Sequence, residues 1–277
     1  MMKIKDYHCH TEFSDDSVYP MEEAVVDAIA FGIDELCFTD HVDYGVHPDF
    51  HDPSAKVVNG KKIANVDYPV YVKRIDELQE KYKGQIVLKK GLEFGIQTHT
   101  IPQFQKVFDT YDLDFVLLSI HQVNDEEFWT FDYQDKLTWD EYNLGYYQEM
   151  LDVIKVYKDY SVLAHMDLMR RYDKNGKYPF EKTKEIVTEI LKQVIMDGKG
   201  IEINTSSFKY GLDDLMPSTD ILKLYKELGG RIITIGSDSH RKEHLGSYIK
   251  EVKETLKGLG YTEYCTFEKM KAIFHQL

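Results

Sequence analysis

The segment DYHCH, residues 6–10, begins the pattern that decides the fold class, because it ends a predicted β-strand with two histidines. His8 and His10 are two residues apart, so on a strand both imidazoles point to one face while Cys9 points away. One H-x-H segment alone is weak support for a metal site, since histidines in strands are more often structural. The interpretation therefore depends on how the other predicted strands end.

Further apolar runs rich in Val, Ile, Leu and Phe predict strands with the same kind of ending. They are LCFTDH (36–41), VLKKGLEFG (87–95), FVLLSIHQV (115–123), SVLAHMD (161–167), GIEINTS (200–206) and IITIGSDSH (232–240). Amphipathic stretches predict helices over 20–32, 68–84, 101–112, 139–159, 180–198, 218–230 and 243–260, followed by a mixed tail. This repeated strand–helix order predicts a parallel sheet with right-handed crossovers.

Polar or ionisable residues end every predicted strand, and this favours a barrel over an open sheet. They are His8 and His10, Asp40 and His41, Glu93, His121, His165 and Asp167, Asn204, and Asp238 and His240. In a closed parallel barrel all these ends meet on one face, whereas an open sheet would spread them along an edge. We therefore expect an α/β protein with a distorted (β/α)7 TIM-like barrel, formed as a single domain over residues 1–277.

The residue types at these ends suit a site for several metal ions. Asp238 and His240 repeat the spacing of the first pair, and imidazole nitrogens with carboxylate oxygens suit Zn, Fe or Mn. Glu93 lies in the otherwise apolar GLEFG, where a buried carboxylate needs a partner such as a pair of cations. Asp40 and His41 cannot both face inward on a regular strand, so we assign His41 to a metal and Asp40 to a supporting role.

These residues also have plain structural interpretations. Taken singly, His121 and His165 are more often hydrogen-bonded core histidines than ligands. Asp15 and Asp16 lie in a loop, where acidic residues are often solvated or cap a helix, and spacing alone does not choose between them. The loop 42–66 is a candidate lid and equally a plain surface. We interpret the remaining histidines as surface residues, with the first two nearest the mouth: His47, His51, His99, His244 and His275.

Composition limits the class of protein. The chain has 277 residues, a formal net charge of −14 and three cysteines that never form a C-x-x-C pair. The charge disfavours nucleic acid and anionic membranes as partners, because binding to phosphate backbones relies on clustered Lys and Arg. No segment resembles a signal peptide or a membrane span. We therefore expect a soluble protein of the reducing cytoplasm, whose oligomeric state the sequence does not indicate.

Taken together, the motifs resemble those of the polymerase and histidinol phosphatase (PHP) family. They are H-x-H near the N-terminus, T-D-H after the first helix, a strand-end Glu, isolated strand-end histidines and G-S-D-S-H near the C-terminus. The segments AHMDLMRRY (164–172) and EINTSS (202–207) are most similar to the stand-alone histidinol-phosphate phosphatases of that family. The resemblance implies a cytoplasmic metal-dependent phosphomonoesterase of histidine biosynthesis, which hydrolyses L-histidinol phosphate to L-histidinol and phosphate on a distorted (β/α)7 barrel.

The resemblance also implies two to three divalent ions (Zn, Mn or Fe), held by three groups of ligands. The first group is His8, His10, Glu93 and Asp238; the second is Glu93, His121 and His165; the third is Asp16, His41 and His240. Asp16 aligns with the family's loop ligand better than Asp15 does. The charge of such cations exceeds that of their carboxylate ligands, so an acidic protein gains a local positive field for a phosphate ester.

The hypothesised mechanism is in-line attack by metal-bound hydroxide on phosphorus, with Asp238 or His240 passing a proton to the departing alkoxide. Arg171 is our first choice for a phosphate clamp, with contacts added by Ser206 and Lys209. Family members often carry Arg in an N-T-S-G-L-R-like run where this chain reads NTSSFK. Lys209 in that place keeps the positive charge but cannot make the bidentate contact with phosphate that an Arg would make.

Alternative functions remain open at this point. The nearest is another PHP-type phosphoesterase that acts on nucleotides or other small phosphate esters. A metal-dependent amidohydrolase or deaminase also uses an H-x-H first strand, but here no Lys suited to a bridging carbamate ends a middle strand. A non-catalytic metal-binding module would require loss of ligands, and the set has no gap.

Overall fold

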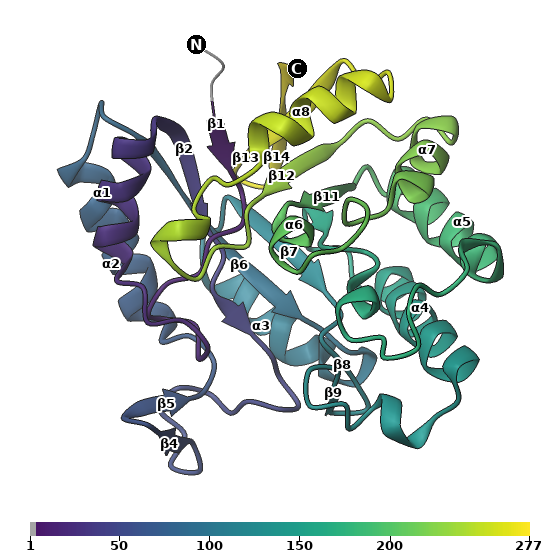
Figure 1. Cartoon of the computed structure of the whole chain (residues 1–277). Coiled ribbons are helices and arrows are strands. Elements are labelled where there is room, and N and C mark those ends of the chain that lie inside the picture. Colours follow the sequence, from purple (N-terminus) through teal and green to yellow (C-terminus); the bar gives the residue numbers. More distant parts are fainter. Residues whose placement is uncertain (1–3) are drawn as a thin grey trace.

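The computed structural model describes residues 4–277 and shows an α/β barrel (Figure 1). In this part of the chain, seven strands pair in parallel in the order β1-β2-β6-β7-β10-β11-β12. Their bounds are β1 (Ile4–Asp6), β2 (Ile33–Phe38), β6 (Val87–Gly95), β7 (Phe115–Ser119), β10 (Val162–Leu163), β11 (Gly200–Asn204) and β12 (Ile233–Gly236). A short strand, β3 (His41–Val42), also pairs with β6. The parallel sheet predicted from strand–helix alternation is confirmed.

The first and last strands come together and leave the barrel nearly closed. The amide of Tyr7 donates to the carbonyl of Ile235 at 3.1 Å, and Cys9 forms an isolated parallel bridge with Ser239. Beyond the regular strands, the amide of His10 donates to the Ser239 carbonyl at 2.8 Å. The predicted distorted seven-stranded barrel is therefore confirmed.

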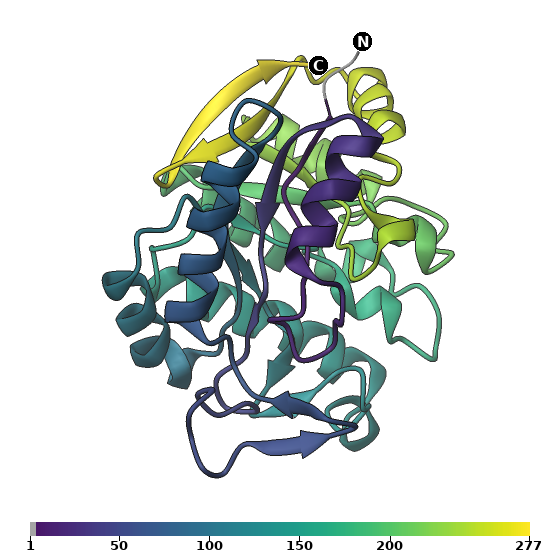
Figure 2. The same cartoon turned by 90° about the vertical axis from the view of Figure 1, so that its left-hand side faces the viewer.

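Helices cover the outside of the barrel, apart from the single-turn α6, which directly follows β11 (Figures 1 and 2). Their bounds are α1 (Met21–Phe31), α2 (Tyr68–Lys81), α3 (Ile101–Thr110), α4 (Trp139–Val156), α5 (Phe180–Met196), α6 (Ser206–Lys209), α7 (Thr219–Glu227) and α8 (Ile249–Gly258). Local signals explain their ends. Helix α1 follows Pro20 and stops at Gly32, which has a left-handed φ of 73°. Helix α4 begins with a capping box between Thr138 and Glu141.

Side chains alternate between the barrel interior and the helical layer. In β7, Val116 and Leu118 pack toward the helices, while Phe115 and Leu117 belong to a second apolar group inside the barrel. Phe267 joins this inner group from the C-terminal tail. The inner apolar group fills the end of the barrel where the strands begin, opposite the end where the strand-end histidines lie.

Three antiparallel hairpins of the described chain lie outside the barrel. They are β4 (Lys56–Val58) with β5 (Lys61–Ile63), β8 (Gln122–Val123) with β9 (Glu126–Glu127), and β13 (Glu263–Glu268) with β14 (Lys271–Gln276). The last pair is the tail for which the sequence predicted only mixed structure. Single turns of 3-10 helix lie at Thr98–Thr100, Gln134–Lys136, Leu168–Arg171 and Lys242–His244. Across residues 4–277 no helix is both long enough and apolar enough to cross a membrane.

Candidate metal centre

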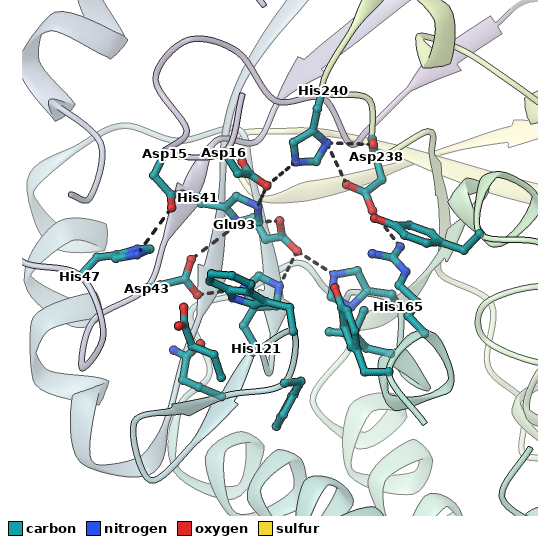
Figure 3. Close-up of a pocket in the computed structure, with 18 of the residues that line it drawn as sticks. Asp15, Asp16, His41, Asp43, His47, Glu93, His121, His165, Asp238 and His240 are labelled. Carbon is teal, nitrogen blue, oxygen red and sulfur yellow. Dashed lines mark hydrogen bonds and ion pairs between the residues drawn. The ribbon is translucent and has the colours of Figure 1, made fainter. Parts of the chain in front are cut away.

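All predicted metal ligands meet at the end of the barrel where the strands finish. Figure 3 shows all of them except His8 and His10. The paired residues lie just past the regular strands rather than within them. His8 and His10 follow β1, which ends at Asp6, and Asp238 and His240 follow β12. Backbone bonds between these two segments, including the 2.9 Å bond from the Asp238 amide to the His8 carbonyl, hold the two pairs side by side.

The first predicted group forms a compact set of four side chains. His8 Nε2 lies 3.1 Å from Glu93 Oε2 and 3.7 Å from Asp238 Oδ1. His10 Nε2 lies 3.4 Å from each of the same two oxygens. The two imidazole nitrogens and two carboxylate oxygens therefore surround one point, as the ligands of one cation would.

Glu93 connects this first group to the second. Its other oxygen, Oε1, lies 2.8 Å from His165 Nε2 and 3.2 Å from His121 Nε2, and it accepts a 2.6 Å hydrogen bond from Ser119 Oγ. Burial alone would raise the pKa of this fully buried carboxyl, but the imidazoles of His8 and His121 hold it well below its ordinary value. An ionised carboxylate with one oxygen toward each group suits a position between two cations.

The third predicted group lies beside the first. Asp16 Oδ2 is 2.9 Å from His240 Nε2 and 3.7 Å from His41 Nε2. Asp15 points the other way, with its Oδ2 3.5 Å from His47 Nε2 (Figure 3). The geometry thus favours Asp16 over Asp15 as the loop ligand, in agreement with the choice that the family resemblance implied.

The described residues fit divalent cations. His10 Nε2 is buried without a hydrogen-bond partner in this part of the chain, although it faces two carboxylates. The His10 ring stacks on those of His41 and His240, with centroids 4.2 and 4.1 Å apart. Burial and the charges of these two neighbouring imidazoles lower the pKa of His10 well below its ordinary value. A neutral imidazole whose nitrogen lone pair is free and faces carboxylates can coordinate a divalent cation.

Buried carboxylates bind the outward nitrogens of these ligands. His8 Nδ1 donates to Glu202 Oε1 at 2.5 Å, and His121 Nδ1 donates to Asp43 Oδ1 at 2.8 Å. Such bonds fix the tautomer that leaves Nε2 free for a cation. The Asp43 carboxylate lies so close to the backbone of β6 that position 95 must be glycine, because a Cβ at Gly95 would overlap this carboxylate.

His10 is held in the same way through a hydroxyl group. Its Nδ1 lies 3.0 Å from Ser14 Oγ, which donates to Asp40 Oδ1 at 2.7 Å. Asp40 also accepts bonds from the amide and hydroxyl of Thr11. The supporting role predicted for Asp40 therefore matches its geometry, with Ser14 as the intermediate.

The backbone is strained at two of the predicted ligands. His165 has a φ of 22° and Asp238 a φ of 53°, values that residues with a Cβ rarely adopt. Each is held by buried bonds: the His165 amide donates to Glu202 Oε2 at 3.0 Å, and Asp238 Oδ2 accepts a 2.8 Å bond from Arg171. Strain of this kind concentrates at functional sites.

Arg171 lies next to the first group, as predicted for a phosphate clamp. Its side chain is only 6% exposed, and its terminal NH2 group donates to Asn204 Oδ1 at 3.2 Å and also to Ser206 Oγ. Its guanidinium carbon lies 4.5 Å from the centroid of the Tyr210 ring. Ser206 is buried behind Arg171, whereas Arg171 itself lines the cavity. Arg170 points elsewhere, toward Asp167 and Asp213.

A cavity of about 560 Å³ opens over the predicted ligands, and its two sides differ in charge. Arg171, Lys209 and Arg241 line one side. Asp15 and Asp43 lie across the cavity from Asp238, the ion-pair partner of Arg171 (Figure 3), and Glu127 lies within reach of their charges. Phe128 and Trp129 also line the cavity. His47 lines the cavity, so its expected place near the mouth is confirmed, but its side chain is only 13% exposed and is not a surface one. The cavity is large enough for a small organic phosphate.

The sequence of the chain matches the PHP domain over residues 6–206. This chain belongs to the PHP family. The histidinol-phosphatase of Lactococcus lactis is 34% identical over 276 residues, covering 98% of this chain and 96% of that protein. A probable histidinol-phosphatase of Thermotoga maritima is 29% identical over 272 residues, covering 97% of each chain.

A solved PHP structure supports the same relationship. The crystal structure of the Lactococcus lactis histidinol phosphate phosphatase, complexed with Zn, L-histidinol and phosphate, superposes with a TM-score of 0.83 at 31% identity. The match covers 99% of this chain and all of that one. The predicted family and PHP fold are thereby confirmed, while the individual ligand assignments stay predictions that the geometry supports.

Sequence reasoning missed several residues of this PHP site. Glu202 and Asp43, which bind the outward nitrogens of two ligands, were not singled out, nor were Glu127 and Trp129 of the cavity. A signal existed for two of them. Glu202 is a lone carboxylate in the apolar GIEIN, and Asp43 follows His41 at the same-face spacing.

Proposed function

We propose that this PHP protein is a histidinol-phosphate phosphatase, formed as one domain over residues 1–277 and dependent on two to three divalent ions. The observation that carries the proposal is the position of Glu93 between groups of histidines, in the same cavity as Arg171 and Lys209. Divalent cations at such groups supply positive charge for a phosphate ester and lower the pKa of water. Zn, Mn and Fe all suit these ligand types.

The chain's own residues would then bind and orient the phosphate. Arg171 offers a planar guanidinium, fixed by Asn204 and Asp238, on the cationic side of the cavity. Lys209 adds a second positive charge on the same side, in the place where relatives often carry Arg. Asp238, which pairs with Arg171, or His240 would pass a proton to the departing alkoxide, which is a poor leaving group without it.

The opposite side of the cavity suits the rest of the substrate. L-histidinol phosphate carries an ammonium group and an imidazole close to its phosphate, so a pocket for it needs anionic and aromatic surfaces opposite the cationic side. Asp15 and Glu127 supply carboxylates, and Trp129 supplies a ring that is 60% exposed. A mononucleotide would instead bring its uncharged sugar and base against these carboxylates.

A substrate panel tests this proposal. The purified protein, supplied with Zn or Mn, is assayed for phosphate release from L-histidinol phosphate, mononucleotides and simple alkyl phosphates, with bound metal measured by elemental analysis. We expect kcat/KM for L-histidinol phosphate to exceed the others by at least about tenfold, since each well-placed ionic contact is worth about 1.5–3 kcal/mol. Equal or better hydrolysis of a mononucleotide would support the alternative substrate class. Fewer than two bound metals with no turnover would contradict the proposal.

A further inference from the structure

The β4–β5 hairpin touches the loop that carries Asp16. Lys61, the first residue of β5, extends toward the segment after β1, and its ammonium donates to the backbone carbonyls of both Ser14 and Ser17. These carbonyls lie on either side of Asp15 and Asp16. Figure 2 shows the hairpin beside this N-terminal segment, although Lys61 lies 44 residues after Ser17 in the chain.

Other bonds hold both ends of this loop: at its end, Ser17 Oγ donates to the His240 carbonyl at 3.2 Å and accepts a bond from the Tyr19 amide at 3.2 Å. Asp40 fixes Thr11 and Ser14 through their hydroxyl groups. The Asp16 side chain is 50% exposed, and its ion pairs in the described chain are with His41 and His240. These bonds use the hydroxyl groups of Ser14 and Ser17, and Lys61 adds a bridge between the carbonyls of the same two residues, across the segment that aims the Asp16 carboxylate at the two imidazoles.

Lys61 holds the Ser14–Ser17 loop through its backbone and does not bond to the Asp16 carboxylate. Its ammonium is half-buried among acidic residues, yet its hydrogen bonds go to main-chain oxygens. Burial lowers the pKa of Lys61, while the charges of Asp15 and Asp16 oppose that change. A lysine paired directly with Asp16 would compete with a cation for its oxygens, whereas a lysine bound to the backbone leaves them available.

We propose that Lys61 is a positioning residue for the third cation, which it serves by fixing the Ser14–Ser17 loop so that Asp16 faces His41 and His240. The inference rests on the proposed metal-dependent function. It assigns a role to the hairpin that the ligand set does not require. Ser14 also contacts His10 of the first group, but through a hydroxyl that Asp40 holds, so we expect the hairpin to act on the third cation site rather than on the sites around Glu93.

The test compares Lys61→Met, Lys61→Arg and the control Lys62→Met in the full chain. Lys62 is adjacent, but its ammonium lies over the Phe50 ring, 4.8 Å from the centroid. Each protein is stripped of metal and titrated with Zn²⁺ and with Co²⁺, and stoichiometry, affinity and the visible Co²⁺ spectrum are recorded. Thermal unfolding without metal serves as the folding control.

We expect Lys61→Met to weaken the last cation to bind by at least about tenfold, the range found for residues that orient ligands, with the tighter sites unchanged. Lys61→Arg, whose guanidinium can still donate to both carbonyls, should restore most of that affinity. Lys62→Met should match the wild type. Unchanged affinities in Lys61→Met, equal weakening of all sites, no restoration by Lys61→Arg, or a wild type that binds only two cations would each overturn the inference. A wild type that binds fewer than two metals and hydrolyses no phosphate ester would instead defeat the proposed function.

Discussion

Arg171 is the residue on which phosphate binding depends most directly. Its buried guanidinium faces the cavity and is fixed by Asn204 and Asp238. We expect Arg171→Ala to raise KM at least about tenfold, because a charge-assisted contact to phosphate is worth about 1.5–3 kcal/mol. Steady-state kinetics measure this, with elemental analysis to show that bound metal is retained.

Arg170 is the matched control for that variant. It is adjacent in sequence but binds Asp167, Asp213 and the Leu215 carbonyl, away from the ligands. Arg170→Gln should lower the melting temperature and leave KM near the wild-type value. If Arg171→Ala loses metal in proportion to activity, Arg171 supports Asp238 rather than binding phosphate.

Glu202 acts on the metal site through His8. Its Oε1 accepts the bond from His8 Nδ1, and its Oε2 accepts the bond from the His165 amide. Glu202→Gln removes the charge that favours the required His8 tautomer, so affinity for the tightest cations should fall about 10–100-fold. Titration of the metal-free variant with Zn²⁺ measures this affinity. Glu35→Gln, which changes a buried carboxylate bonded to Tyr7 and Lys5, should leave metal affinity unchanged.

Residue environments also show why the site was only partly predictable from sequence. The ligands have recognisable spacing, but Glu202 and Asp43 differ from ordinary buried carboxylates only through their contacts with His8 and His121. Those contacts join strands that are far apart in the chain. Lys61 had no signal at all, because its partners are backbone carbonyls of a loop.

At the scale of elements, β13–β14 closes the barrel end opposite the metal site. Tyr7 O–H donates to the Phe267 carbonyl at 3.1 Å, and the Phe267 ring lies 5.1 Å from that of Phe115, between centroids. We expect Phe267→Ala to reduce the free energy of unfolding by about 3–5 kcal/mol through lost burial and the cavity left behind. Chemical denaturation measures this.

The same variant separates stability from function. Metal bound per folded chain and KM should stay at wild-type values in Phe267→Ala, because Phe267 contacts the inner apolar group and none of the predicted ligands. Loss of metal under conditions where the variant remains folded would show that the hairpin supports the site as well as the core.

Elements with local signals were predictable, and those without them were not. Strand β6 spans Val87–Gly95, the range expected from its apolar run, and α1 stops at its expected Gly32. The β13–β14 turn has left-handed φ values of 48° at Lys269 and 63° at Met270, which hairpin turns usually reserve for Asn, Asp or Gly. A sequence rule based on those residues therefore does not find this hairpin.

The whole molecule combines a formal charge of −14 with a buried cluster of imidazoles, so protons and cations compete for one centre. Burial alone would lower the pKa of His121, but Asp43 and Glu93 raise it to about 9. In the unfolded chain the pKa is about 6.5. Without metal, protonated His121 therefore contributes stability that is full below pH 6.5 and is lost as pH rises through about 9.

Metal binding has the opposite pH dependence, because a cation needs the neutral imidazole and must displace that proton. Affinity at the His121 group should rise by up to about tenfold per pH unit between pH 6.5 and 9. The difference in melting temperature between Mn²⁺-loaded and chelator-treated protein should therefore widen over this range. His99→Gln, which changes an exposed imidazole bonded to Asp125, should leave the widening intact. A difference that stays constant from pH 6.5 to 9 would mean that cations do not replace the proton on His121, and that its bonds to Asp43 and Glu93 serve the fold alone.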